Sequence, residues 1–315
     1  MRVLVTGAAG KVGKATVPHL QAAGHSVTAS DRFGRSFDRP DPGAAPHVTA
    51  DLTDAGQVFS LVGGFTETEA GPKPGRFDAV VHAGAIPAPG RHAPHTVFGN
   101  NLMGLFHVVE ACVRWQVPRL VNISSETAAG FLFAERPWYP AYLPVDEDLP
   151  EAPQDPYGLA KLLGEQVCAA AVRRSDLRCV SLRPTWVQDA GSYARNLGPS
   201  VADPEEPSLT GWSYIDAGDL AAAIRLAVEC DLTGHEVFYI AADDTIGGRD
   251  LHASWRRAFP DSPTELRPVE RPDASGISTG KARRLLGWRP EVSWADHLNP
   301  DGTPRARAVP AEGRA

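Results

Sequence analysis

A tyrosine and a lysine four residues apart, Tyr157 and Lys161, are the first candidates for chemistry. Asp155 and Pro156 are typical of a helix start, and the apolar spacing predicts a long helix from 155 to about 174. Residues at this spacing share one helical face, so both side chains can reach one ligand. The ammonium charge would then lower the pKa of the phenol, which suits it to moving a hydroxyl proton.

Two serines, Ser124 and Ser125, follow the buried strand predicted over 119–124. Ligands of parallel sheets bind at the carboxyl ends of strands, where these hydroxyls would lie. Hydride transfer between a carbinol and nicotinamide needs a base and a hydrogen-bond donor for the developing alkoxide. Tyr157, Lys161 and Ser125 can supply both.

Glycines at positions 7, 10 and 13 indicate where a nucleotide would bind. Gly7, Gly10 and Gly13 follow an apolar run at 3–5 and open a helical pattern. Without a Cβ, the backbone can approach a pyrophosphate at the helix N-terminus. Asp31 ends the next apolar segment, about 20 residues beyond the glycines, where a carboxylate can accept both ribose hydroxyls of NAD. Taken alone, the glycine triplet could also be a turn that binds nothing.

Other cofactor contacts are expected around this turn and beyond the strands that follow it. Arg32 and Arg35 would also allow NADP. Alternating strand and helix patterns predict an α/β fold with a doubly wound parallel sheet. The further expected contacts are Ala9, Lys11, Val12, Arg32, Asp51, Leu52, Ala83, Gly84 and Ala85.

Composition excludes several other classes of protein. The 315 residues carry a formal charge of −7 and no basic block, which argues against nucleic acid and an anionic membrane surface. No apolar stretch is long enough to span a bilayer, and no signal peptide is visible, so a cytoplasmic protein is expected. The four cysteines are widely spaced and the ten histidines scattered, so no metal site is expected.

Taken together, these motifs resemble the extended short-chain dehydrogenase/reductases, the NAD-dependent epimerase/dehydratase group. The resemblance runs from Met1 to about Pro290. It rests on Thr6-Gly-x-x-Gly-x-x-Gly13, Asp31, Asp51-Leu52, Asn101, the two serines, Tyr157-x-x-x-Lys161 and Leu182-Arg183-Pro184. It implies a Rossmann-like domain over 1–183 to which 216–241 returns, a small C-terminal α/β substrate lobe over 184–295, and a flexible tail over 296–315.

The resemblance also assigns roles. Tyr157 would be the acid/base, Lys161 would hold the nicotinamide ribose, and Ser125 would bind the reacting oxygen. Ser125 is preferred to Ser124 because the family's serine usually lies five residues before a loop glycine, here Gly130. Asn101 would join the catalytic group, and Asn101 and Pro184 would contact the cofactor.

Substrate residues are less clearly indicated. Nucleotide-sugar epimerases usually carry an arginine where this chain has Trp212, which puts a nucleotide-sugar substrate in doubt. The stretches 117–125, 157–161 and 211–216 resemble uronate and aldose 1-dehydrogenases, in which an arginine at the spacing of Arg195 holds a sugar acid. Those enzymes have Asn and His where this chain has Glu126 and Thr127. The expected substrate contacts are Ile86, Ser125, Glu126, Thr127, Arg195 and Trp212.

Three functions remain open at this point. A dehydrogenase acting on a sugar or sugar acid is favoured. An epimerase or dehydratase that keeps its NAD is the second, and a cofactor-sensing protein without catalysis is the third. The family often dimerises through the helices that carry Asn101 and Tyr157, so a homodimer is expected.

Overall fold

The computed structural model describes residues 1–32, 44–64, 77–90, 92–136 and 138–305. The sequence after Asp31 is rich in Pro and Gly and predicts a loop, and residues 63–76 are rich in Gly, Pro, Thr and Glu and predict a flexible surface insertion. Most of the loop and most of the insertion lie outside the described residues. Within the described residues, no helix is both long and apolar enough to cross a membrane.

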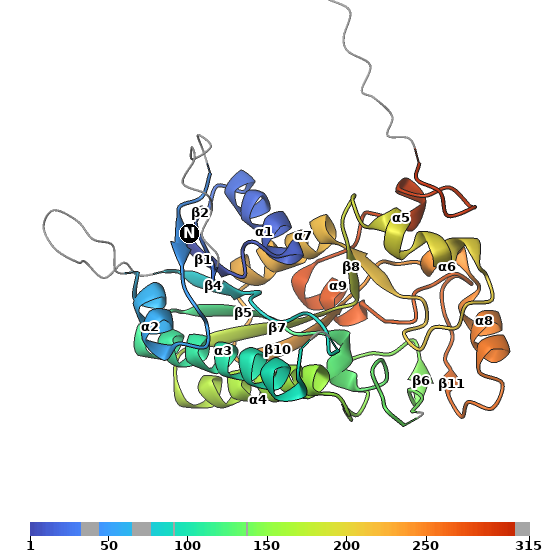
Figure 1. The fold of residues 1–315 in the computed structure, drawn as a ribbon, viewed down its shortest axis with the longest axis horizontal. Coiled ribbons are helices and arrows are strands. Elements are labelled where there is room, and N and C mark those ends of the chain that lie inside the picture. The colour runs from blue at the N-terminus through green and yellow to red at the C-terminus, as the bar shows by residue number, and fades with distance from the viewer. Residues whose placement is uncertain (33–43, 65–76, 91, 137, 306–315) are drawn as a thin grey trace, which may run out of the picture.

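A seven-stranded parallel sheet runs through the centre of the molecule (Figure 1). Its order is β10-β7-β5-β4-β1-β2-β3, so the direction of winding reverses between β1 and β4. Such a reversal opens a crevice beyond the strand ends, where ligands of doubly wound folds bind. The strands are β1 Arg2–Thr6, β2 Ser26–Asp31, β3 His47–Thr49, β4 Ala79–His82, β5 Arg119–Ile123, β7 Arg178–Pro184 and β10 His235–Ile240.

Helices cover both faces of this sheet, because alternate side chains along each strand point to opposite sides. Val3 and Val5 of β1 pack with α1 Lys11–Ala22, α7 Ala217–Glu229 and α9 Gly280–Leu286. Leu4 packs instead with the helices of the other face. Those helices are α2 Ala55–Gly63, α3 Pro94–Arg114 and α4 Pro156–Arg174. The predicted doubly wound α/β fold is therefore confirmed.

Local sequence explains the start of α4, the helix that carries Tyr157. Asp155 caps it: one carboxylate oxygen accepts hydrogen bonds from the backbone N–H groups of Tyr157 and Gly158, both at 2.9 Å. Pro156 occupies the first turn, where no backbone donor is needed. The helix therefore begins at a fixed residue, which sets the direction of the Tyr157 side chain.

The side chains on the two faces of the sheet form two hydrophobic clusters, and smaller elements surround a third. This third cluster includes Tyr193, Trp212 and Trp255. Two pairs of short parallel strands, β6 with β11 and β8 with β9, belong to this region. Its elements are β6 Tyr142–Leu143, β8 Trp186–Gln188, α5 Tyr193–Asn196, α6 Gly198–Ala202, β9 Tyr214–Asp216, α8 Leu251–Ala258 and β11 Glu265–Leu266. Three short 3-10 helices complete the described elements: η1 Glu126–Ala129, η2 Ile246–Gly248 and η3 Trp294–Asp296.

The chain after Asp296 differs from the expected flexible tail. Leu298 is buried in the third cluster, and the His297 ring stacks on Tyr193 with 3.9 Å between ring centroids. These contacts hold residues 297 and 298, and backbone hydrogen bonds from Asn299 to Thr303 and from Arg305 to His297 order the chain up to residue 305. Residues 306–315 lie outside the described part of the chain.

Candidate active site

The turn between β1 and α1 is closely packed at two glycines. Gly7 has φ +69°, and a Cβ there would lie 2.5 Å from the backbone carbon of Ala83, beyond β4. A Cβ on Gly13 would lie 2.4 Å from the carbonyl oxygen of Gly7. Neither position has room for a side chain, so the backbone of this turn stays open to a ligand at the N-terminus of α1.

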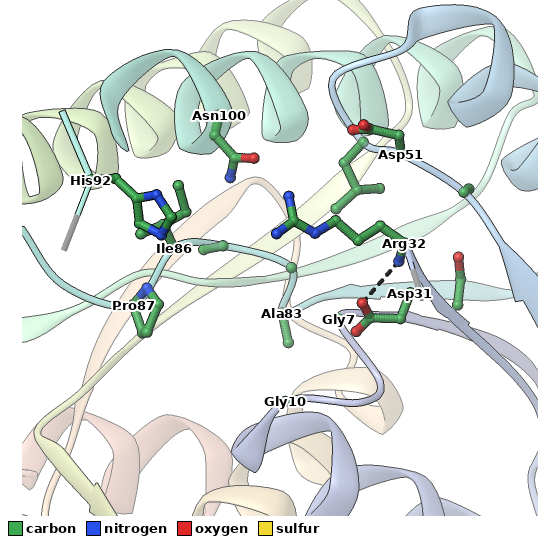
Figure 2. A pocket seen from close by; sticks show the side chains of 15 residues that line it. Gly7, Gly10, Asp31, Arg32, Asp51, Ala83, Ile86, Pro87, His92 and Asn100 are labelled. Carbon is green, nitrogen blue, oxygen red and sulfur yellow. Dashed lines mark hydrogen bonds between the residues drawn. The ribbon is translucent and has the colours of Figure 1, made fainter. Parts of the chain in front are cut away.

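A cleft of about 260 Å³ opens at this turn, beyond the carboxyl ends of the strands (Figure 2). Asp31 lies beside the glycine turn, and its carboxylate accepts hydrogen bonds from the N–H groups of Ala9 at 3.0 Å and Arg32 at 2.8 Å. Asp51 lies farther along the cleft, and hydrogen bonds from Thr53 hold the pKa of its carboxyl below the usual range. The cleft thus combines small backbone groups with carboxylates, as a nucleotide site requires.

Most residues expected to hold the cofactor line this cleft. Expected and found there are Gly7, Gly10, Asp31, Arg32, Asp51, Leu52, Ala83, Gly84 and Ala85, together with Ile86 from the substrate group. The cleft also contains residues that the motifs did not single out: Ser30, Ala50, Pro87, His92 and Asn100. Figure 2 shows Ile86, Pro87, His92 and Asn100 gathered at the end of the cleft away from Asp31.

Lys11 serves a different purpose from the one expected. Its ammonium donates to the carbonyl of Val187 and to the hydroxyl of Ser192, both at 2.9 Å. Burial lowers the pKa of Lys11 despite the nearby Asp189. The lysine therefore ties the start of α1 to β8 and the segment that follows, and Ala9 and Val12 flank it without lining the cleft.

Tyr157, Ser125 and Lys161 come together beyond β5. The hydroxyl of Ser125 lies near enough to the phenol of Tyr157 to act on its pKa, and it accepts a hydrogen bond from the N–H of Thr127 at 3.2 Å. The ammonium of Lys161 lies 5.6 Å from the centroid of the Tyr157 ring and donates to the carbonyl of Ile123 at 2.6 Å. β5 pairs with β4, so this group adjoins the end of the cleft formed by 83–87.

The expected lowering of the phenol's pKa is not found. Burial raises the pKa of Tyr157 to about 12, and the Ser125 hydroxyl opposes this only in part. Burial also lowers the pKa of Lys161 to about 8, with Glu165 acting in the opposite direction. Desolvation is the largest cause for both groups, because both are shielded from water.

Ser124 belongs to a separate buried network. Its hydroxyl donates to Glu165 at 2.5 Å, and Glu165 forms two hydrogen bonds, at 2.9 and 2.6 Å, with the guanidinium of Arg183. Arg183 reaches Glu151 as well, at 2.8 Å. Ser124 is hydrogen-bonded to Glu165, whereas Ser125 lies near the phenol of Tyr157. This difference favours Ser125 over Ser124 as the serine that would bind the reacting oxygen.

Asn101 has both of its amide atoms committed to the loop after β4. It accepts from the N–H of Ile86 at 2.8 Å and donates to the carbonyl of Ile86 at 3.0 Å. It therefore holds Ile86 at the edge of the cleft instead of joining Tyr157. Pro184 ends β7 beside Ile240 and is buried.

The expected substrate residues are divided between the site and other regions. Glu126 and Thr127 are buried directly after Ser125, and the Glu126 Oε2 and the Thr127 hydroxyl have no hydrogen-bond partner in the described chain. Arg195 is exposed on α5, close enough to Lys11 that its charge lowers the pKa of that lysine.

The expectation for Trp212 is corrected by its packing. The indole is 1% exposed in the third hydrophobic cluster, and its N–H donates to the carbonyl of Glu206 at 2.9 Å. The guanidinium of Arg249 lies over its ring, 5.5 Å from the centroid. An indole packed in this way has no group left for a substrate.

Two of the cysteines lie close to a histidine in the fold, although their spacing in the sequence does not indicate this. Ligand atoms of Cys168, Cys179 and His235 lie within 4.8 Å of one another. Cys168 and Cys179 come from the consecutive elements α4 and β7, but His235 lies on β10, far along the chain, so no Cys/His motif could be seen. Burial raises the pKa of the Cys179 thiol and lowers that of the His235 imidazole.

A glycine turn at the sheet's reversal point, next to a Ser–Tyr–Lys group beyond β5, defines a nucleotide-dependent α/β enzyme. The family model of the NAD-dependent epimerase/dehydratase family matches residues 3–241, and the chain belongs to this family. The resemblance noted in the sequence is confirmed, and so is the prediction of an enzyme.

Two relatives of known activity illustrate the range within the family. Uronate dehydrogenase from Pseudomonas putida is 29% identical over 258 residues, covering 80% of this chain and 81% of the relative. UDP-glucose 4-epimerase from Mycolicibacterium smegmatis is 28% identical over 320 residues, covering 95% of this chain and 96% of the relative. The chain thus resembles both a dehydrogenase and an epimerase at similar identity.

Solved structures support the fold and the cofactor. A short-chain dehydrogenase/reductase superfamily protein from Agrobacterium tumefaciens with bound NAD superposes with a TM-score of 0.67 at 25% identity, covering 94% of each chain. The cofactor is NAD, as predicted. The cleft fits it, since Gly7 and Gly13 leave a cradle that a Cβ would fill and Asp31 lies where a ribose would be bound.

Proposed function

We propose that the protein is an NAD-dependent dehydrogenase that oxidises a secondary or hemiacetal hydroxyl of a small sugar or sugar acid. The proposal rests on the closeness of the Ser125 hydroxyl to the Tyr157 phenol, with Lys161 alongside, beyond β5 and next to the strand that leads into the nucleotide cleft. A phenol and a serine hydroxyl in contact can bind one substrate oxygen together.

Each residue of this group has a definite task in the proposal. Bound NAD supplies the hydride acceptor. The Ser125 hydroxyl binds the reacting oxygen, and Tyr157 takes its proton in the fraction of the protein whose phenol has ionised, a fraction that the raised pKa keeps small at pH 7. The carbonyl of Ile123 fixes the Lys161 ammonium, which holds the nicotinamide ribose. Gly7, Gly10, Gly13 and Asp31 hold the pyrophosphate and the adenosine ribose.

The surroundings of Trp212 favour a substrate without a nucleotide. Arg249 is the cation beside this indole, and its guanidinium donates to the carbonyls of Ser200, Asp203 and Glu206. A guanidinium engaged by three carbonyl oxygens is not available as a bidentate phosphate clamp.

Turnover of free NAD tests the proposal. Purified protein incubated with NAD and a panel of aldoses and uronates should form NADH, followed by its absorbance. Failure of every sugar to yield NADH would contradict the proposal, provided that NAD binding is shown separately.

An epimerase that retains its NAD is the second candidate, favoured by the similarity to UDP-glucose 4-epimerase over almost the full chain. It predicts a changed sugar without net NADH, and NAD that remains with the protein through gel filtration. The third candidate, a cofactor sensor, predicts NAD binding without any product.

We also propose a homodimer formed through α3 and α4. These helices pack against each other, and Met103, Phe106 and Leu159 on them are 38–43% exposed. Exposed apolar side chains on adjoining helices are typical of a subunit interface. Light scattering tests the oligomeric state, and Phe106→Glu should give a monomer.

We further propose that the chain is divided into a cofactor domain and a substrate lobe. A cytoplasmic location stays a prediction.

A further inference from the structure

The carboxyl group of Glu126 is the most unusual polar group near the reacting residues. Its side chain is 3% exposed, and its Oε2 atom has no hydrogen-bond partner in the described chain. A buried carboxyl without partners is costly, because the group has lost water and gained nothing in return. Such a group in an active site is explained most simply by a ligand that supplies the missing partner.

Glu126 lies next to the proposed reacting residues. It directly follows Ser125, whose hydroxyl contacts the Tyr157 phenol. It is also near enough to Tyr157 and to Tyr239 of β10 that its negative charge would raise the pKa of both phenols. The carboxyl therefore lies beside the atom that binds the reacting oxygen.

In the described part of the chain, no cation forms an ion pair with Glu126. The element η1 that begins with Glu126 packs on α4 and β7. Arg183 of β7 is paired with Glu165 and Glu151, and Lys161 of α4 donates to a backbone carbonyl. The titratable groups on which the charge of Glu126 acts are Tyr157 and Tyr239. The other titratable and charged groups on or beside these elements are Asp155, Lys161, Glu165 and Arg183.

We propose that Glu126 recognises a hydroxyl group of an uncharged sugar and selects against the corresponding sugar acid. This inference rests on the proposed dehydrogenase function and narrows its substrate class. A sugar hydroxyl can donate to the free carboxyl oxygen and satisfy it. A uronate carboxylate would have to lose its water beside a carboxyl that no cation pairs with, and once Glu126 is charged the two carboxylates would also repel each other.

The protonation of Glu126 agrees with this geometry. Burial raises the pKa of Glu126 to about 8, and no neighbouring charge opposes the effect. The carboxyl is therefore largely neutral at pH 7 and charged at pH 9. Selection against a carboxylate substrate should consequently become stronger as the pH rises.

The test compares matched pairs of substrates that differ at one carbon: galactose with galacturonate, and glucose with glucuronate. For the natural protein, kcat/KM should be higher for the neutral sugar by about tenfold or more. The ratio within a pair should increase between pH 7 and pH 9. Tyr157 is neutral over this range and cancels in the ratio. Lys161 loses its charge over the same interval, because its pKa is about 8, so a variant that keeps Lys161 is needed to isolate Glu126.

Glu126→Gln keeps the shape of the side chain and removes its charge. In this variant the preference for the neutral sugar should shrink and depend less on pH than in the natural protein. Glu147→Gln is the matched control, because Glu147 already accepts a hydrogen bond from the N–H of Tyr239 at 2.8 Å. That variant should keep the preference of the natural protein. NAD affinity and melting temperature establish that each variant is folded.

The outcomes separate this inference from the function on which it rests. Oxidation of the uronate as readily as the neutral sugar, or a preference unchanged in Glu126→Gln, overturns the role of Glu126 and leaves the dehydrogenase intact. If no sugar yields NADH, the dehydrogenase proposal is overturned. In that case, calorimetry with NADH-loaded protein measures the affinity for each sugar of the same pairs and tests whether Glu126 selects the neutral sugar. Tighter binding of the neutral sugar that is lost in Glu126→Gln supports the inference, whereas equal binding or none overturns it.

Discussion

Asn101 holds both backbone polar groups of Ile86, accepting from its N–H at 2.8 Å and donating to its carbonyl at 3.0 Å. The amide lies on α3, whereas Ile86 lies on the loop after β4 and lines the nucleotide cleft. One buried side chain thus fixes the wall of the cleft against a helix. We therefore propose that Asn101 is a positioning residue, which would act on the cofactor through Ile86.

Replacement of Asn101 tests this positioning. Asn101→Leu would leave the N–H and carbonyl of Ile86 unpaired, at a cost of about 1–3 kcal/mol in the free energy of unfolding. NAD affinity should fall as well, because the cleft wall is released. Asn122→Leu is the control: Asn122 donates to Ser181 at 3.1 Å within the sheet. It should lose stability without losing NAD affinity. Equal NAD affinity in both variants would contradict the positioning role.

Asp31 should determine the preference for NAD over NADP. Its carboxylate is held at the glycine turn by the N–H groups of Ala9 and Arg32. A charge there repels a 2′-phosphate, so Asp31→Asn should reduce the ratio of NAD to NADP affinity by about tenfold or more. Fluorescence titration with each nucleotide measures the ratio. Asp54→Asn, at the exposed cap of α2, should leave it unchanged. A ratio unaffected by Asp31→Asn would rule out this role.

The raised pKa of Glu126 has a consequence for stability. The pKa is about 8 in the folded protein and near its usual 4.5 in the unfolded chain. Between these values the folded state binds more protons, so the free energy of unfolding falls as pH rises from about 4.5 to about 8. Glu126→Gln lacks this loss, and its stability relative to the natural protein should increase by a few kcal/mol over that interval.

Urea denaturation at pH 5 and pH 8 measures that difference. The lowered pKa of Lys161 acts in the opposite direction, between about 8 and 10.5, and is present in both proteins. It therefore cancels in the comparison. A stability difference independent of pH would mean that Glu126 ionises normally in the folded protein.

Much of the fold and of the reacting group could be predicted from local patterns. Gly7, Gly10 and Gly13 lie within one strand–helix junction, and Tyr157 and Lys161 lie within one turn of a helix, so spacing along the chain reflects spacing in the molecule. The parallel sheet could be predicted because strand and helix patterns alternate along the chain, which is typical of doubly wound α/β folds.

Features that depend on distant packing could not be read in this way. Trp212 is an indole in a ligand-associated segment, but contacts with Glu206 and Arg249 turn it into the core. Lys11 belongs to the glycine motif, yet its partner Val187 lies far along the chain. The pKa of Tyr157 also depends on burial, which the helical spacing of Lys161 does not reveal.

Tyr157→Phe tests the central claim most directly. The variant keeps the buried ring and loses the hydroxyl that contacts Ser125. With the most active sugar of the panel, NADH formation should fall by about 10²–10⁴-fold while NAD affinity is unchanged. Tyr142→Phe removes a hydroxyl bonded to Asp146, away from the site, and should retain activity. Turnover by Tyr157→Phe at the rate of the natural protein would contradict the proposed mechanism.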